Sequence, residues 1–148
     1  MLIIPKSLLA ELRAHGEETY PQECCGVMLG SMGPADGKRS VSRIVRCGNT
    51  RNDSPQNRYH IDPRELIAAQ KLGRERGEDV VGFYHSHPDH PPQWSQTDLA
   101  EAHWIGCSYV ITGVNQGAAQ VTNSFALEGT LEEDKRFVAE QIVELEKS

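Results

Sequence analysis

The stretch from Val80 to Asp98 reads VVGFYHSHPDHPPQWSQTD and joins an apolar strand, two histidines and a helix start. Side chains alternate between the two faces of an extended strand, so His85 and His87 project together while Ser86 points to the other face. Pro88 cannot donate to a strand ladder and is expected to end the strand. Two imidazoles that converge at the end of a strand indicate a metal site.

The second half of this stretch supplies a third ligand. Ser95-Gln96-Thr97-Asp98 has the form of a helix start, and an Asp in the first turn faces back toward the end of the strand. His85, His87 and Asp98 would give a divalent ion three N/O ligands and leave one tetrahedral position for water, which is typical of a catalytic zinc site. We therefore expect one Zn²⁺ per chain. A structural zinc site would normally have a fourth protein ligand.

Length and composition indicate a globular protein. With 148 residues, the chain is expected to form one domain over 1–148, large enough to bury roughly 70% of the surface that its unfolded state exposes. The 38% hydrophobic content is ordinary, and no apolar run approaches the roughly 20 residues needed to cross a bilayer. The first residues, MLIIPKSLLAELRAHGEE, lack the features of a secretory signal. The expected location is cytoplasmic, without a membrane partner.

Net charge and cysteine spacing argue against nucleic-acid-binding, zinc-ribbon and thioredoxin-like proteins. The formal net charge of -6, from 21 acidic and 15 basic residues, disfavours a phosphate-binding surface, so no nucleic acid partner is expected. Cys24, Cys25, Cys47 and Cys107 show no CxxC spacing, so neither a zinc ribbon nor a thioredoxin-like motif is indicated. We expect reduced thiols that are mostly buried.

The N-terminal part of the chain predicts one helix and one strand. Leucines fall on one stripe of Pro5–His15, which predicts an amphipathic helix that covers the core, and Gly16 would end it. Residues 24–32, CCGVMLGSM, predict a buried strand. Glycine inside a strand suggests a bend or the close approach of another backbone, which applies to Gly26 and Gly30.

The middle of the chain predicts a hairpin, a loop and a second helix. After a turn at 33–40, residues 41–47 alternate in polarity and are expected to pair with the preceding strand. Residues 48–59 are rich in turn formers and predict a loop. Asp62 as cap, followed by Pro63 and an acidic third position, starts a helix that ends among Gly73 and Gly77.

The C-terminal half completes a mixed sheet. Val80–His87 is the predicted central strand, the Ser95 helix continues through Trp104, and 108–114 and 118–127 are two further strands around a turn. A final helix is expected from Thr130, with apolar residues near one stripe at Leu131, Val138, Ile142 and Leu145. Helices interspersed among hairpins indicate a compact α/β or α+β domain with a mixed sheet and helical cover.

These residues resemble the JAMM (MPN-plus) zinc metallopeptidase family. His85-x-His87-Pro88, six residues, Ser95, two residues and Asp98 match the family motif at every position, and Glu23 before a glycine-containing apolar strand matches its upstream glutamate. The resemblance covers most of the chain, because the order of the elements also agrees. It implies a single MPN-like domain with a mixed, curved β-sheet flanked by helices.

The resemblance also implies roles. Zinc held by His85, His87 and Asp98 would lower the pKa of its bound water toward ~7 and polarise a substrate carbonyl. Glu23 would act as general base and pass the proton to the leaving amine, while the Ser95 hydroxyl would donate to the oxyanion. The implied reaction is hydrolysis of an amide or isopeptide bond.

Each assignment has a structural alternative. Ser95 and Asp98 form a capping pair at a helix N-terminus, a role compatible with catalysis and metal binding. Glu23 read alone would be a solvated acid. The other histidines and Trp94 are expected to be exposed, hydrogen-bonded or packed rather than functional: His15, His60, His90 and His103. The HExxH motif and the zinc deaminase pattern are absent, which removes two rival zinc hydrolase classes.

Short prokaryotic members of the JAMM family resemble this chain most closely, on PQECCGVMLG and HSHPDHP. That resemblance implies a ubiquitin-like or sulfur-carrier protein with a C-terminal Gly-Gly tail as substrate, and a link to cysteine biosynthesis. Loops 48–60 and 88–94 would wall the groove for that tail. The alternatives are a non-catalytic MPN-type protein-binding module and a deubiquitinase-like isopeptidase. The sequence leaves the oligomeric state open, a homodimer included.

Overall fold

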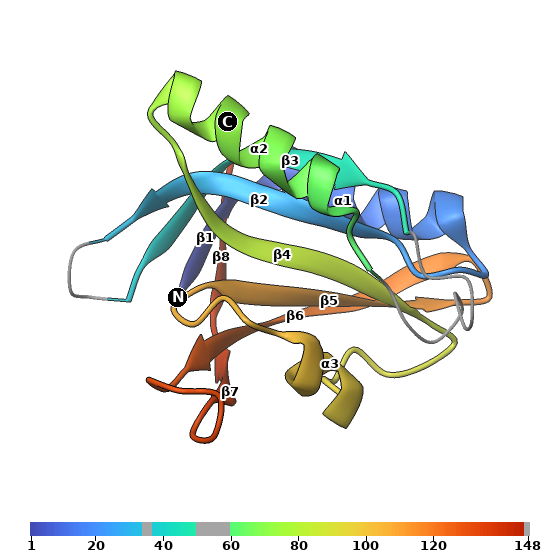
Figure 1. The fold of residues 1–148 in the computed structure, drawn as a ribbon. Helices are drawn as coiled ribbons and strands as arrows, with labels where there is room; N and C mark the ends of the chain where they lie inside the picture. The colour runs from blue at the N-terminus through green and yellow to red at the C-terminus, as the bar shows by residue number, and fades with distance from the viewer. Residues whose placement is uncertain (34–36, 50–59, 147–148) are drawn as a thin grey trace.

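A computed structural model describes residues 1–33, 37–49 and 60–146. These residues form an eight-stranded sheet of order β7-β6-β5-β4-β2-β3-β1-β8 and three helices (Figure 1). The strands are β1 (Leu2–Pro5), β2 (Cys25–Met32), β3 (Arg39–Cys47), β4 (Asp79–Pro88), β5 (Ser108–Asn115), β6 (Ala118–Glu128), β7 (Arg136–Glu140) and β8 (Ile142–Leu145). The helices are α1 (Lys6–Thr19), α2 (Pro63–Arg76) and α3 (Gln96–Glu101).

The sheet mixes parallel and antiparallel pairs and is nearly closed. β4 lies between antiparallel β2 and parallel β5, and β1 runs parallel to both β3 and β8. The two strands at the ends of the sheet, β7 and β8, are separated in the chain only by Gln141, whose carbonyl accepts from the backbone N–H of Leu2. This curved, mixed sheet with flanking helices confirms the predicted fold class.

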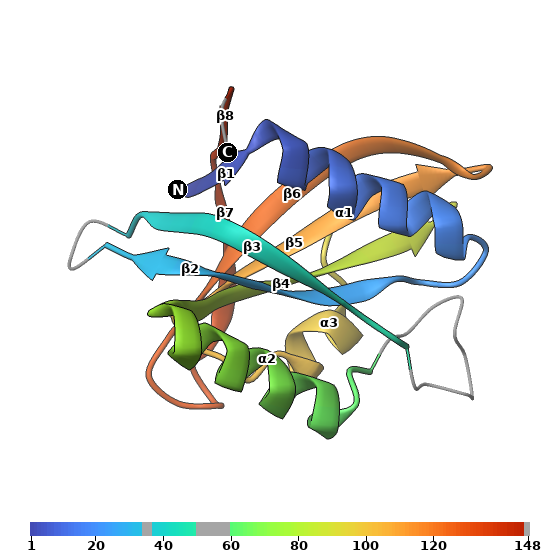
Figure 2. The ribbon, with the colours of Figure 1, turned by 90° about the horizontal axis from the view of Figure 1, so that it is seen from above.

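Helices cover both faces of the sheet. Figure 2 shows α1 on one side and α2 with α3 on the other. On the α1 side, Leu12 belongs to a buried cluster with Met28 and Tyr84. On the opposite side, Ala69 of α2 is clustered with Val27. The central strands are therefore buried on both faces, which holds the end of β4 in place.

The glycines predicted to allow close approaches do so. A Cβ on Gly26 would lie 2.1 Å from the Tyr84 ring, and one on Gly30 would lie 1.8 Å from the carbonyl oxygen of Ser40. The β2–β3 hairpin is confirmed, with a register shift between Leu29 and Gly30. Gly16 does not end helix α1 as predicted, because the helix continues through it to Thr19. It instead allows a close approach to β5, since a Cβ there would lie only 3.1 Å from Val114 Cγ2.

The predicted C-terminal helix is wrong, because the chain forms β7 and β8 there. β7 pairs with β6, and β8 pairs with β1. Phe137 packs against the cluster on the α2 side and Ile142 against the cluster on the α1 side. The apolar residues thus serve two different core clusters, whereas a helical stripe would have served one.

Other boundaries differ by a few residues. α3 ends at Glu101, so the predicted extension through Trp104 is wrong; Trp104 instead packs its ring 5.4 Å from that of Phe83. β1 was not predicted, and β3 begins inside the predicted turn at 33–40, of which 34–36 lie outside the described residues. The predicted Asp62 cap and Gly77 stop of α2 are confirmed. Within the described ranges, no helix combines the length and apolar character needed to span a membrane.

Candidate metal centre

The register of β2 and β4 brings Glu23 to the two histidines. Cys25 pairs with His85, and the backbone N–H of Ser86 donates to the Cys24 carbonyl across 3.3 Å. Directly opposed residues of an antiparallel pair share a face, so the next position of this register sets Glu23 across from His87. The sequence placed Glu23 just before a predicted strand, and in the structure it lies just before β2.

His85, His87 and Asp98 converge at the end of β4. The two Nε2 atoms are 3.2 Å apart, and Asp98 places Oδ1 3.3 Å from His85 Nε2 and Oδ2 3.2 Å from His87 Nε2. All three ligand atoms lie within 4.8 Å of one another, which makes the group able to hold a metal ion. Strand alternation and the first turn of α3 produce this arrangement, as the sequence predicted.

The spacing of these three atoms fits zinc. Zn–N and Zn–O bonds of about 2.0–2.1 Å at tetrahedral angles set ligand atoms roughly 3.3 Å apart. The two Nε2 atoms are 3.2 Å apart, and each lies 3.2 or 3.3 Å from a different oxygen of Asp98, which is close to that requirement. Two imidazoles and one carboxylate are also the mixed N/O set that borderline-soft divalent ions accept. The residues present therefore fit a zinc ion.

The electrostatics of the cluster favour a charged Asp98. Burial alone would raise the pKa of Asp98, but hydrogen bonds with His85 and His87 outweigh it and hold the pKa well below its ordinary value. Burial lowers the pKa of His85, against the opposing effect of Asp98. Burial would also lower the pKa of His87, yet its contacts with Asp98 and the Pro91 carbonyl raise it. Asp98 is therefore ionised, and an ionised carboxylate beside two imidazoles is the form that binds a cation.

Ser95 caps helix α3 and faces the same site. Its Oγ accepts from the backbone N–H of Asp98 across 3.0 Å, and Asp98 Oδ2 accepts from the Ser95 N–H across 2.9 Å. This reciprocal pair is a capping box, so the predicted capping role is confirmed. The Ser95 hydroxyl still has its own proton to donate, because the cap uses only a lone pair.

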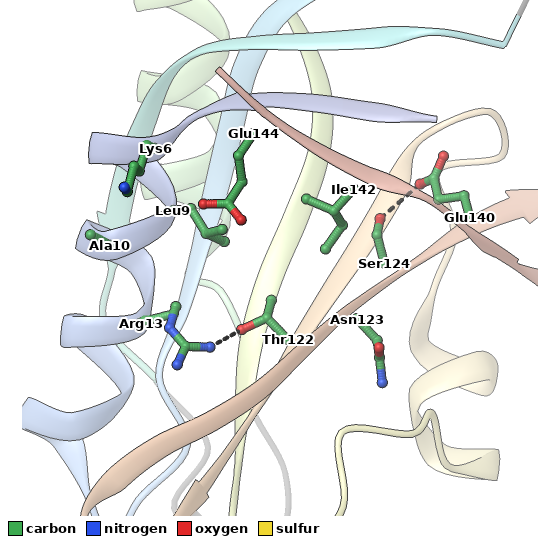
Figure 3. Close-up of a pocket in the computed structure, with 10 residues that line it drawn as sticks. All are labelled: Lys6, Leu9, Ala10, Arg13, Thr122, Asn123, Ser124, Glu140, Ile142 and Glu144. Atoms are coloured by element: carbon green, nitrogen blue, oxygen red, sulfur yellow. Dashed lines mark hydrogen bonds between the residues drawn. The ribbon is translucent and has the colours of Figure 1, made fainter. Parts of the chain in front are cut away.

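One cavity connects Ser95 with Glu23 and His87. Its volume is about 490 Å³, and its lining comprises Glu23, His87, His90, Pro91, Gln93, Ser95 and Thr97. A larger cavity of about 540 Å³ lies between α1 and strands β6 to β8. Figure 3 shows Arg13 and Thr122 paired inside that cavity, and none of the predicted site residues lines it. Cavity size alone would therefore select the wrong site.

Glu23 is buried in the smaller cavity. The residue is 3% exposed, and no hydrogen-bond partner is found among the described residues for its Oε1. Burial, followed by the charges of Asp98 and Glu101, raises the pKa of Glu23 to about 9. A buried polar atom without a partner is costly, which marks it as a group available for a ligand.

The comparison with known proteins assigns the family. The family described as prokaryotic homologs of the JAB domain matches residues 5–128. This chain belongs to that family. The match spans the element order from α1 to β6 and includes Glu23 together with the three metal-site residues.

Named relatives of the JAB-family chain come from archaea and bacteria. A desampylase from Haloferax volcanii is 34% identical over 105 residues, covering 71% of this chain and 72% of the relative. A probable TtuB-protein conjugate cleaving protease from Thermus thermophilus is 35% identical over 115 residues, covering 78% and 72%. A CysO-cysteine peptidase from Mycobacterium tuberculosis is 25% identical over 142 residues, covering 95% and 93%.

A solved structure agrees with the JAB fold described above. A protein from Desulfitobacterium hafniense, determined in solution, superposes with a TM-score of 0.83 at 30% sequence identity. The alignment covers 99% of this chain and 94% of that one. The agreement extends over the whole chain, beyond the range that the family match covers.

The remaining histidines of the JAB-family chain lie apart from the cluster or at its margin. His15 is buried and shares a 2.7 Å hydrogen bond with the Tyr84 hydroxyl, while His103 is exposed and pairs with Glu132. His90 lines the smaller cavity, beside Glu23 and His87. The carbonyl of Pro91 was also missed; it contacts His87 Nδ1 at 2.9 Å, and a backbone group leaves no signal in side-chain chemistry.

Proposed function

We propose that this chain is a zinc-dependent hydrolase that cleaves an amide or isopeptide bond at the C-terminal Gly-Gly tail of a ubiquitin-like or sulfur-carrier protein. One observation carries the proposal: the side chains of His85, His87 and Asp98 converge so that they could hold a metal ion, beside a cavity that is also lined by Glu23 and Ser95. Zinc, when bound, supplies a Lewis acid and lowers the pKa of water. The names of the relatives, a desampylase, a conjugate cleaving protease and a peptidase, support hydrolysis.

His85, His87 and Asp98 would hold the ion. His85 and His87 are both buried, and Asp98 is fixed by its bond to the Ser95 N–H. Burial on the sheet and the capping box hold these side chains before the metal arrives, so little conformational freedom is lost on binding. The rigid arrangement favours a single coordination geometry.

Glu23 would move the proton. It lines the cavity beside His87, so it can take a proton from attacking water and deliver it to the leaving amine. In the metal-free protein, the raised pKa keeps this carboxyl group protonated at neutral pH. A dication held by Asp98 would offset the negative charge that contributes to this shift, and would favour the ionised form that a general base requires.

Ser95 would stabilise the developing negative charge on the substrate carbonyl oxygen. Its side chain is exposed to the cavity, and its proton is not used by the capping box. Donors of this kind contribute on the order of 10²–10³ in rate. The roles of cap and oxyanion donor are compatible because they use different atoms of one hydroxyl group.

The substrate class rests on the relatives and on the shape of the site. His90, Pro91 and Gln93 form one wall of the cavity, in the loop predicted to wall the groove. The other predicted wall, 48–60, lies mostly outside the described residues. A Gly-Gly tail has no side chains to clash in a narrow groove and suits extended binding. The name of the CysO-cysteine peptidase supports an amino acid adduct as one group that the enzyme removes from the carrier tail.

We also infer that residues 1–148 form one domain that works in the cytoplasm. Both core clusters lie on the same sheet, which supports one folding unit. All four cysteines are free and buried, which suits a reducing compartment.

The proposal is tested with metal-stripped protein, added Zn²⁺ and a carrier protein extended beyond its Gly-Gly terminus. Mass spectrometry of the carrier reports the cut. We expect about one bound zinc per chain. Glu23→Gln should bind zinc and lose turnover, and His87→Ala should lose both. The exposed Glu18→Gln and His103→Ala serve as matched controls and should retain both.

Three results would contradict the proposal. Cleavage that survives chelation would remove the role of the metal. Wild-type turnover by Glu23→Gln would remove the general base. Binding of the carrier without any cleavage would instead favour the non-catalytic protein-binding module.

A further inference from the structure

The loop that follows the histidines is anchored at its first residue. Asp89 directly follows β4 and has a φ of +58°, a left-handed conformation that Asp tolerates better than most residues. Its backbone N–H donates to the Val114 carbonyl of β5 across 2.7 Å. The chain therefore turns sharply away from the sheet at this residue, and strand β5 fixes the position of the turn.

The side chain of Asp89 joins two more segments to this turn. Its Oδ2 accepts from the Tyr20 hydroxyl across 2.6 Å, and its Oδ1 accepts from the Gln116 N–H across 2.8 Å. Tyr20 follows α1, and Gln116 lies in the turn between β5 and β6. Three segments distant in sequence thus meet at one carboxylate.

A second anchor holds the other end of the loop. The Asn123 side-chain amide of β6 donates to the Pro92 carbonyl across 3.0 Å. Figure 3 shows this side chain pointing away from Arg13 and Thr122. Gly113 lets the loop lie close to β5, because a Cβ there would be 3.2 Å from Pro92 Cδ and 3.3 Å from the His90 carbonyl oxygen.

The carbonyl between the two anchors contacts a metal-site histidine. Pro91 O lies 2.9 Å from His87 Nδ1, a bond that requires the imidazole proton on Nδ1. That tautomer leaves the Nε2 lone pair free for a metal. The competing neutral tautomer carries its proton on Nε2, where it would donate to Asp98 Oδ2 at 3.2 Å and block the lone pair.

We propose that Asp89 and Asn123 are positioning residues that hold the Pro91 carbonyl against His87 Nδ1 and so keep His87 Nε2 available as a metal ligand. The proposal rests on the proposed function in its use of zinc. Neither residue touches the cluster through any hydrogen bond described here; both act through the loop. Loss of either anchor should lower metal affinity far more than it lowers the global stability of the protein.

The test compares Asp89→Ala, Asn123→Ala and the double variant with wild type. In metal-free protein, ¹⁵N NMR of the imidazole, read on the high-pH plateau of the chemical shifts where His87 is neutral, reports the tautomer of His87. We expect the share of the Nε2–H form to rise in each variant and most in the double variant. Zinc affinity, measured by competition with a chromogenic chelator, should fall about 10- to 100-fold.

Control variants separate positioning from general loss of stability. Glu78 also accepts two side-chain hydrogen bonds, from Ser42 and Arg43, but lies at the opposite end of β4. Glu78→Ala should lower the melting temperature while leaving tautomer and zinc affinity unchanged. Asp89→Asn keeps an acceptor for Gln116 and should restore most of the affinity. If Asp89→Ala does not fold, Tyr20→Phe removes one of its bonds and should give a smaller shift of the same sign.

Unchanged tautomer ratios and zinc affinity in the double variant would overturn the proposal. So would an equal loss of affinity in Glu78→Ala. Failure of the proposed function has a different signature, because wild-type protein would then bind no zinc while the tautomer shift of the variants would still be observed.

Discussion

The Ser95 N–H donates to Asp98 Oδ2 across 2.9 Å, and the same oxygen lies 3.2 Å from His87 Nε2. One carboxylate thus both closes the capping box of α3 and completes the group of three side chains that could hold a metal ion. The cap fixes the rotamer of Asp98, so the start of the helix determines where the third ligand lies. Changes at Ser95 should therefore separate the stability of the cap from the chemistry of the site.

Ser95→Ala and Ser95→Gly should lose activity equally but stability unequally. Alanine at a cap costs about 1 kcal/mol, whereas glycine costs only a few tenths. Both remove the hydroxyl proton, and we expect turnover to fall on the order of 10²–10³-fold in each. Urea unfolding and carrier cleavage measure the two effects. If Ser95 were only a cap, Ser95→Gly would keep nearly all of the wild-type turnover.

Glu23 should make the metal-free protein less stable as the pH rises. Burial, then Asp98 and Glu101, raises its pKa from 4.5 to about 9, so between these values the folded state holds a proton that the unfolded state has released. Stability must fall with increasing pH in this window, by up to about 1.4 kcal/mol per pH unit. Glu23→Gln cannot titrate and should lose this slope.

The measurement is the free energy of unfolding of chelator-treated protein at pH 5 and pH 8. Other titrating groups affect wild type and Glu23→Gln alike, so the difference between the two proteins isolates Glu23. The variant should gain stability relative to wild type at the higher pH. A constant difference across the window would show that the carboxyl group titrates normally. Excess Zn²⁺ should reduce the slope.

Sequence reasoning predicted that His85, His87 and Asp98 converge, because local rules set the positions of these three side chains. Strand alternation places His85 and His87 on one face, and helix capping places Asp98 in the first turn. Glu23 required the family motif, because its position depends on the register of β2 and β4, which no local rule fixes. The contact of the Pro91 carbonyl with His87 could not be predicted for another reason, because it depends on the path of the backbone rather than on a side chain.

The same reasoning failed at the C-terminus, where long-range pairing decides the structure. Leu131, Val138 and Ile142 fall near one helical stripe, yet Phe137 and Ile142 pack on opposite faces of the sheet. β7 and β8 form because the ends of the sheet leave edges to be paired, and tertiary context overrides weak helix propensity. A sequence does not display those edges before the sheet is known.

The four thiols should react slowly in the folded protein. Burial raises the pKa of Cys24 and Cys47 to about 12, that of Cys107 to about 11, and that of Cys25 further. The thiolate is the reactive form, so little of it exists at pH 8. Ellman's reagent should modify the native protein slowly. After unfolding in guanidinium, it should react with four thiols per chain. Fast inactivation by iodoacetamide would contradict this prediction.

Glu140 should be far more important for stability than an exposed glutamate of the same region. Its side chain, 6% exposed, pairs with Arg39 at 3.0 Å and accepts from Ser124 at 2.7 Å, tying β7 to β3 and β6. Glu140→Ala leaves the Arg39 side chain, 11% exposed, without this partner, and removing one member of a buried pair costs about 3–5 kcal/mol. Glu128→Ala is the matched control: Glu128 is 47% exposed and pairs across the same two strands with Arg136, which is 62% exposed, and screening makes such surface pairs weak. Urea unfolding should show a large loss for Glu140→Ala and little change for Glu128→Ala. Equal losses in the two variants would mean that β7 is held by its backbone pairing with β6 rather than by this carboxylate.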